Sequence, residues 1–343
     1  MKRLLNTLYV TTPGSYLSRD GETVLVTVER EVKLQIPIHM LGAILCFGPV
    51  NCTQPLLALC ADRHVSVAFY SMNGRFQSRL EGPVSGNVLL RMEQYRRAEN
   101  QDSAAAIARN IVMAKIANSR TVIMRAARDN TQPDISAKLR QAVDNLAKHL
   151  AALEERMPLE EIRGHEGDAA HTYFSVFDHL VTNQKESFTF SERNRRPPLD
   201  NINALLSFVY VVLANDVSSA LEGVGLDPAV GYLHSVRPGR HGLALDILEE
   251  FRAYFADRMV VSLINLRQVQ PAGFTKTESG AVVMDDETRK IVLTEYQKRK
   301  IEEINHPYLK EKVAAGLLPH AQAMLLARYL RGDIDGYPPF IFR

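Results

Sequence analysis

A glutamate near the middle of the chain, Glu166, is predicted to point its carboxylate toward an apolar environment. At about 100° per residue, it shares a helix face with Ala170, Tyr173 and Phe177. A buried carboxylate without a partner is costly, so Glu166 must meet a metal ion, a set of hydrogen-bond donors or a cationic side chain. A buried ion pair with an arginine would account for the same pattern.

Two further carboxylates lie close together near the start of a helix predicted for residues 243–266. Asp246 and Glu249 are three residues apart, and are therefore neighbours on one helix face. Carboxylates this close repel each other, and a divalent cation would relieve that repulsion. The alternative is a solvated acidic face, which is our interpretation of Glu250 and Asp257 on the same helix.

A histidine, His234, comes just before this helix and follows apolar residues. Taken alone, such a histidine is more often a core residue whose ring nitrogens are hydrogen-bonded. Together with carboxylates from two helices it becomes a candidate ligand, because one imidazole with carboxylates suits Mn²⁺ and tolerates Mg²⁺. Such a site fits phosphoryl chemistry, in which the cation polarises a phosphate and activates a hydroxyl nucleophile.

Two types of sequence periodicity divide the chain. Residues 1–82 contain short β-branched or apolar runs separated by turn residues, and Asn73-Gly74 is a hairpin signal. After a linker at residues 83–88, apolar residues recur with a helical period through residues 89–343. The sequence therefore predicts an α+β protein of two domains, a β-sandwich followed by a larger all-α catalytic domain. The strands are predicted at 23–28, 32–36, 43–47 and 65–70, with one helix at 54–61. The later helices are predicted at 89–98, 104–118, 135–152, 159–181, 203–214, 243–266, 286–305 and 318–330, with a loop or short hairpin at 268–284.

Basic residues are clustered, although the net charge of the chain is only +2. One group contains Arg193, Arg195 and Arg196, and another contains Arg237 and Arg240. Local groups of this kind can neutralise phosphates even in a nearly neutral chain, so they are candidate DNA contacts. A solvated surface is the alternative for each group alone.

Composition restricts the compartment that we expect. No run of about 18 apolar residues is evident, so we predict no membrane span. The three cysteines, Cys46, Cys52 and Cys60, lack metal-binding spacing and lie among apolar neighbours, which indicates reduced thiols. A cytoplasmic location is therefore expected.

Four motifs in a fixed order resemble those of one known family. They are Gly164-His165-Glu166-Gly167, Arg196-Pro197-Pro198 with the run 203–207, Gly231-Tyr232-Leu233-His234, and the run 243–252. In this order and over nearly the whole chain, they resemble the CRISPR-associated adaptation integrase, the universal spacer-acquisition nuclease. The C-terminal segment 327–340 resembles type I systems of subtype C.

This resemblance implies a site and a reaction. Glu166, His234 and Glu249 would be the metal ligands, with Asp246 as a nearby carboxylate that matters for activity, and Mn²⁺ or Mg²⁺ as cofactor. The implied reaction is transesterification, in which the 3′-hydroxyl of a DNA fragment attacks a phosphodiester in a CRISPR array. The implied partners are double-stranded and branched DNA, a second copy of the chain, and a small ferredoxin-like adaptation nuclease.

Two other functions remain open at this stage. A branched-DNA repair nuclease would share the site but would cut without joining strands. A non-catalytic DNA-binding scaffold would bind DNA tightly, and its acidic cluster would be structural.

Overall fold

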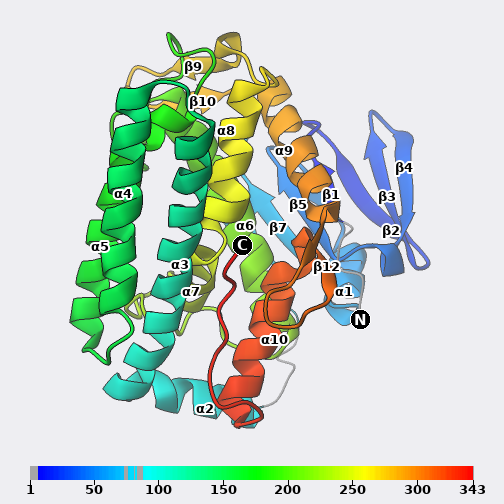
Figure 1. Cartoon of the computed structure of the whole chain (residues 1–343). Coiled ribbons are helices and arrows are strands. Elements are labelled where there is room, and N and C mark those ends of the chain that lie inside the picture. The colour runs from blue at the N-terminus through cyan, green and yellow to red at the C-terminus, as the bar shows by residue number, and fades with distance from the viewer. Residues whose placement is uncertain (1–6, 73–75, 81, 83–87, 343) are drawn as a thin grey trace.

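The structure is a computed structural model that describes residues 7–72, 76–80, 82 and 88–342 (Figure 1). A strand-rich N-terminal region precedes a larger helical domain, which confirms the predicted fold class. The predicted linker 83–88 and the Asn73-Gly74 turn lie outside the described residues, except for Val88. The predicted domain boundaries stay a prediction.

Two four-stranded sheets form the N-terminal region. The first has the order β1 (Thr7–Val10), β5 (Ala43–Phe47), β7 (Ser66–Tyr70) and β8 (Phe76–Arg79), and only the β7–β8 pair is antiparallel. The second has the order β4 (Glu31–Pro37), β3 (Thr23–Val28), β2 (Tyr16–Asp20) and β6 (Asn51–Cys52). Alternate residues of both sheets share one core, and helix α1 (Gln54–Asp62) contributes to it.

The first sheet is buried on its other face as well. Leu45, Phe47, Ala68 and Tyr70 belong to the core of the helical domain, whereas Ile44, Cys46 and Val67 belong to the core between the sheets. Because side chains alternate along a strand, β5 and β7 pack against both cores. The rings of Phe47 and Phe208 lie 5.9 Å apart across this contact.

The helical domain is built from nine helices within the described residues. They are α2 (Val88–Glu99), α3 (Gln101–Asp129), α4 (Pro133–Ala152), α5 (Leu159–Ser175), α6 (Asn201–Gly223), α7 (Gly242–Glu249), α8 (Arg258–Asn265), α9 (Asp286–Ile301) and α10 (Leu318–Arg331). The long helices α3, α4 and α5 lie side by side (Figure 1). Asparagine or aspartate side chains cap α3, α6 and α9 by accepting a backbone N–H at the first turn.

Short elements connect these helices. Four 3₁₀ turns are described: η1 (Ile38–Met40), η2 (Phe177–Leu180), η4 (Pro271–Gly273) and η5 (Ala315–Leu317). The weakly patterned segment 268–284 contains the hairpin of β9 (Phe274–Lys276) and β10 (Val282–Met284), as predicted. A second hairpin joins β11 (Glu303–Asn305) to β12 (Lys312–Ala314).

Several predicted helices have different ends in the structure. The helix predicted for 104–118 extends to Asp129 in α3, and that predicted for 203–214 extends to Gly223 in α6. The helix predicted for 243–266 is divided into α7, a π-helical segment η3 (Arg252–Asp257) and α8. The helix predicted for 159–181 ends at Ser175, and that predicted for 286–305 ends at Ile301. Apolar periodicity cannot resolve a change from an α-helical to a π-helical turn, because both turns keep a similar apolar face.

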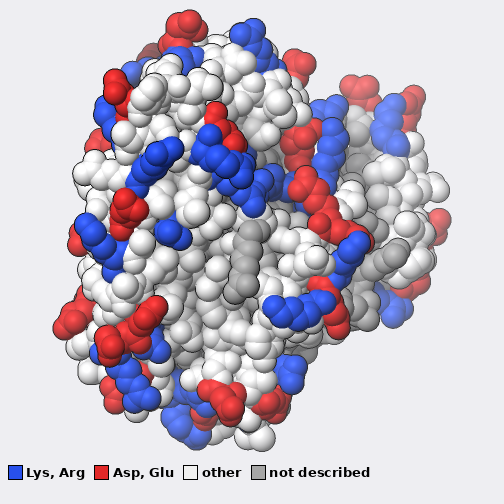
Figure 2. Space-filling model, viewed as in Figure 1, with Lys and Arg blue, Asp and Glu red and all other residues white. Residues whose placement is uncertain are grey.

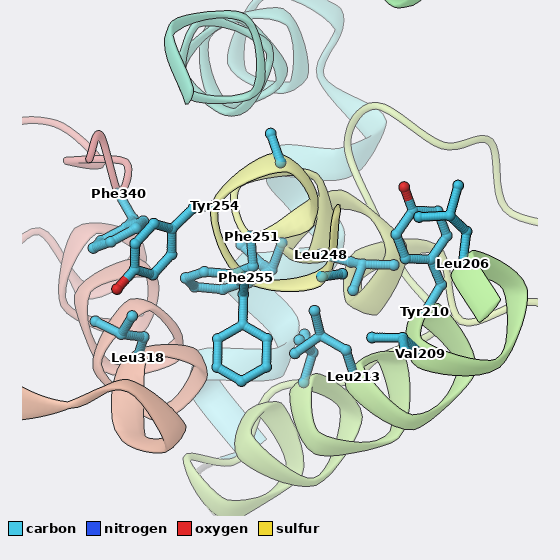
Figure 3. Close-up of a cluster of buried hydrophobic side chains, with 14 of the residues drawn as sticks. Leu206, Val209, Tyr210, Leu213, Leu248, Phe251, Tyr254, Phe255, Leu318 and Phe340 are labelled. Atoms are coloured by element: carbon cyan, nitrogen blue, oxygen red, sulfur yellow. The ribbon is translucent and has the colours of Figure 1, made fainter. Parts of the chain in front are cut away.

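Helix α6 passes through the centre of the helical domain. Its side chains Leu206, Val209 and Leu213 meet Leu248 and Phe255 from the segment α7–η3 (Figure 3). By length and mean hydropathy α6 is apolar enough to cross a membrane, although Asn, Ser and Asp residues interrupt its apolar run. Since 72% of its apolar window is buried inside the molecule, we interpret α6 as a core helix.

Candidate metal centre

The turn that carries His234 is fixed by one buried aspartate. Asp246 on α7 is fully buried, and its Oδ2 accepts the backbone N–H groups of Tyr232 at 2.6 Å and Leu233 at 2.9 Å. Its Oδ1 accepts the backbone N–H of His234 at 2.9 Å and faces His234 Nδ1 at 2.6 Å. Because a carboxylate only accepts, Nδ1 donates this bond, and Nε2 is left with its lone pair available to a cation.

Glycine is required at position 231 for this turn. A Cβ atom there would lie 2.6 Å from Asp246 Oδ2 and 2.6 Å from the carbonyl carbon of Gly242. Such distances are not tolerated, so a side chain would push Asp246 out of its position. Arg163 on α5 holds the turn from the other side, because its Nε and Nη2 donate to the Leu233 carbonyl at 2.9 and 2.8 Å.

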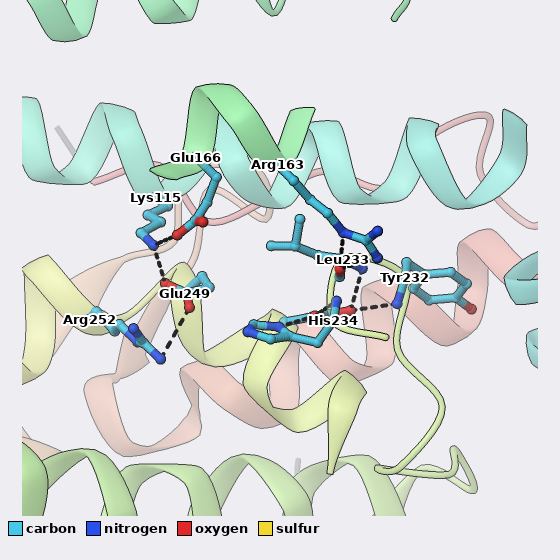
Figure 4. Close-up of polar contacts among 9 residues, drawn as sticks. Lys115, Arg163, Glu166, Tyr232, Leu233, His234, Glu249 and Arg252 are labelled. Carbon is cyan, nitrogen blue, oxygen red and sulfur yellow. Dashed lines mark hydrogen bonds and ion pairs between the residues drawn. The ribbon is translucent and has the colours of Figure 1, made fainter. Parts of the chain in front are cut away.

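The other two predicted ligands are brought together by a lysine (Figure 4). Lys115 on α3 forms ion pairs with Glu166 on α5 and, at 2.9 Å, with Oε2 of Glu249 at the end of α7. Arg252, in the π-helical segment, pairs with Oε1 of Glu249 at 3.1 Å. The alternative considered from sequence, an ion pair of Glu166 with an arginine, is therefore realised with a lysine.

Glu249 stays ionised although it is only 2% exposed. Burial raises its pKa, but Arg252, Lys115 and His234 together outweigh burial and hold the pKa of Glu249 at about 2. The contact of Oε2 with Lys115 lacks hydrogen-bond geometry, so within the described part of the chain this buried oxygen accepts no hydrogen bond. A buried anionic oxygen in this state is suited to a cation.

These residues fit a divalent cation. Two carboxylates and an imidazole whose Nδ1 is held by a second carboxylate are typical donors for Mn²⁺ or Mg²⁺. In the described residues no three His, Cys, Asp or Glu side chains converge closely enough to form a complete ligand set. In Figure 4 the Lys115 ammonium lies between the two glutamates.

The predicted solvated acidic face was wrong for Glu250 and Asp257. Both are buried, at 0% and 1% exposure, because α3, α6 and α10 pack around this segment. Asp257 accepts hydrogen bonds from the hydroxyls of Tyr173 at 2.9 Å and Tyr210 at 2.5 Å, and burial raises its pKa to about 6.

The predicted DNA-binding arginines fall into two classes. Arg193 is half-buried and is bound internally, since its guanidinium donates to Asn203 at 2.6 Å and lies 5.3 Å from the centre of the Tyr210 ring. The side chains of Arg195, Arg196 and Arg237 are exposed.

Both arginine groups meet near Arg240. Burial, and then the positive charges of Arg237, Arg195 and Arg196, lower the pKa of Arg240, whereas Asp246 raises it. Two groups distant in sequence are therefore neighbours beside the Asp246 turn. The face in Figure 2 shows basic and acidic side chains interspersed, with no single basic field.

Sequence reasoning missed three side chains that shape this site: Lys115, Arg163 and Arg252. Lys115 had a readable signal, because it occupies a core-facing position of α3 among Ile111, Val112 and Ile116. A lysine among apolar residues on a core-facing position needs an acidic partner, and that requirement was the signal.

Comparisons with known proteins agree with the family resemblance drawn from the sequence motifs. The family model described as CRISPR associated protein Cas1 matches residues 8–298. A CRISPR-associated endonuclease Cas1 of Chlorobaculum tepidum is 54% identical over 343 residues, and one of Moorella thermoacetica is 50% identical, both over the full length of both chains. A solved CAS1 protein from Thermotoga maritima is 25% identical with a TM-score of 0.82, covering 98% of this chain and all of that one. The chain therefore belongs to the family of CRISPR-associated Cas1 proteins.

Proposed function

We propose that this protein is a metal-dependent DNA endonuclease and integrase that inserts DNA fragments into a CRISPR array. The relatives named above as endonucleases support nuclease chemistry. The single observation that carries the proposal is the arrangement of His234, whose Nδ1 is held by Asp246 while the ring extends toward Glu249 (Figure 4).

Glu166, His234 and Glu249 would hold Mn²⁺ or Mg²⁺. When bound, the cation would stabilise negative charge on the target phosphate and lower the pKa of the attacking hydroxyl. Asp246 fixes the tautomer of His234, so that Nε2 is unprotonated and faces the site. Arg252 keeps Glu249 ionised and in place.

The arginines beside the site, three of them exposed and Arg240 half-buried, would position DNA. Arg195, Arg196, Arg237 and Arg240 would contact phosphates without reading bases. Arg193 is committed to Asn203 and Ser207, and so would contribute by ordering the segment that carries Arg195 and Arg196.

The partners follow from the same proposal. We propose a homodimer that acts in the cytoplasm with a small ferredoxin-like adaptation nuclease, on a double-stranded fragment and a CRISPR leader-repeat. Assignment to a type I, subtype C system stays a prediction.

A strand-transfer assay tests the proposal. Purified protein, with and without the small partner, is mixed with labelled short duplex DNA, a leader-repeat plasmid and Mn²⁺. Glu166→Ala, His234→Ala and Glu249→Ala are compared with Glu250→Gln, a matched change at the neighbouring buried glutamate.

The outcomes separate the three functions. Joining of label to the repeat boundary, lost in the three folded variants and kept in Glu250→Gln, supports the integrase. Cutting without joining would favour a branched-DNA repair nuclease. Tight DNA binding with no Mn²⁺-dependent chemistry would favour a scaffold.

A further inference from the structure

We propose that the ammonium group of Lys115 and a divalent cation exchange at one position, so that metal binding displaces Lys115. This inference rests on the proposed metal site. It assigns to Lys115 the role of an internal counter-ion that holds Glu166 and Glu249 together until the cation replaces it.

The contacts of Lys115 single it out. Within the described residues it is the one cation in ion-pair contact with both glutamates, which come from two different elements. Arg252 reaches only Glu249, and through the other oxygen, Oε1. Lys115 is 9% exposed and is held in the core face of α3, so its contact with both carboxylates is not a chance meeting of surface charges.

The charges favour an exchange over a joint occupancy. A divalent cation between the two carboxylates would meet the ammonium at short range, and like charges at such separations in a partly buried site repel strongly. The oxygen of Glu249 that faces Lys115 accepts no hydrogen bond from the described residues, so at Glu249 the departing ammonium leaves only an ion pair; at Glu166 it leaves one hydrogen bond as well.

A small cavity beside Lys115 offers polar partners to the displaced ammonium group. This cavity, next to the site, is lined by Lys115 itself and by Ser119, Tyr173, Tyr210, Arg252 and Asp257. The four-carbon stem of lysine is flexible. The Ser119 hydroxyl and the Asp257 carboxylate in the cavity wall can accept hydrogen bonds from its ammonium group. The exchange therefore need not leave a buried charge without acceptors.

Direct Mn²⁺ binding to the metal-free, full-length protein tests the exchange, by isothermal titration calorimetry and without DNA. Lys115→Met is compared with wild type and with Lys148→Met, which removes an exposed lysine and makes the same change in net charge. We expect the dissociation constant of Lys115→Met to fall by at least about tenfold, and that of Lys148→Met to stay at the wild-type value.

Thermal melting provides a readout that does not depend on activity. Without metal, Lys115→Met should melt below wild type, because the two glutamates lose their shared counter-ion. Saturating Mn²⁺ should then raise its melting temperature by more than it raises that of wild type. Equal or weaker Mn²⁺ binding by Lys115→Met, with no larger thermal shift, would overturn the exchange.

Two further variants keep the result interpretable. If Lys115→Met does not fold, Lys115→Arg retains the charge and should bind Mn²⁺ no more tightly than wild type; tighter binding would contradict the proposal. His234→Ala tests the metal site separately. If His234→Ala binds Mn²⁺ like wild type, the proposed metal centre fails, whatever Lys115 does.

Discussion

Glu249 and Glu250 are adjacent in sequence and both are buried, but they lie in opposite electrostatic environments. Glu249 faces Lys115 and Arg252, and its pKa is held at about 2. Glu250 faces neutral donors: its carboxylate accepts from Gln322 Nε2 at 2.9 Å, Tyr337 Oη at 2.5 Å and the backbone N–H of Phe340 at 2.7 Å. Burial therefore prevails at Glu250 and raises its pKa to about 8.

The comparison shows that burial alone does not set the charge of a carboxylate. Nearby cations keep Glu249 anionic, as the proposed metal ligand must be, whereas dipolar donors leave Glu250 largely protonated near neutral pH. Glu250 serves instead as an anchor that attaches the C-terminal segment to the core, through Tyr337 and Phe340. Of these two successive residues, Glu249 is the proposed metal ligand and Glu250 stabilises the fold.

The largest expected effect separates the two glutamates by activity. Glu249→Gln removes the anionic ligand, so Mn²⁺-dependent DNA cleavage should fall by more than about 100-fold. Glu250→Gln should keep activity within a few-fold of wild type. Cleavage of a labelled branched DNA checks both, with circular dichroism to confirm folding. Equal losses of cleavage in the two variants would contradict the proposed difference between Glu249 and Glu250.

The next effect concerns the residue that orients His234. Asp246→Asn replaces one accepting oxygen with a donor, which opposes the donors at positions 232–234. Mn²⁺ affinity should fall by about 10- to 100-fold, as is usual when the partner of a ligating histidine is lost. Calorimetry measures this. Asp227→Asn, at an aspartate that also accepts a turn N–H, serves as control and should bind Mn²⁺ normally.

The third prediction tests the stabilising role of Glu250 through its hydrogen-bond donor Tyr337. Tyr337→Phe removes the hydroxyl that donates to Glu250 in a fully buried position, and should lower the free energy of unfolding by about 1–3 kcal/mol. Urea denaturation measures the change, and Mn²⁺ affinity should not move. Tyr308→Phe, at a tyrosine that is 47% exposed, should leave stability unchanged. A loss of metal binding in Tyr337→Phe would show that the anchor and the site are coupled.

The remaining test is the pH dependence of stability. Because the pKa of Glu250 is raised from 4.5 to about 8, the folded protein holds a proton that the unfolded chain releases. The stability from this proton is complete below pH 4.5 and is lost as the pH rises toward 8. The free energy of unfolding should fall by up to about 1.4 kcal/mol per pH unit in this window from this group.

The pH window from 6 to 8 isolates Glu250 best, because the pKa of Asp257 is raised only to about 6. Denaturation curves of wild type and Glu250→Gln across this window give the contribution of Glu250 as a difference. Parallel pH profiles would show that Glu250 is ionised throughout, like Glu249.

Local pattern was sufficient to predict much of this protein. Alternating apolar residues predicted strands such as β3, and the predicted helix start at residue 286 agrees with α9, which the structure shows to be capped by Asp285. Residue types and helix faces made Glu166, His234, Asp246 and Glu249 candidate site residues, and the family resemblance implied that Glu166, His234 and Glu249 are the metal ligands, which stays a prediction. The π-helical segment η3 was not predictable from an apolar period.

Only the tertiary structure decided what each acidic residue became. Lys115 precedes Glu249 by 134 positions in the chain, and Tyr337 follows Glu250 by 87, yet these contacts give the two glutamates opposite charge states. The sequence determined which groups can ionise and where the backbone turns. The ionisation state depends on the charges and dipoles within a few ångströms in space, and the fold alone brings those together.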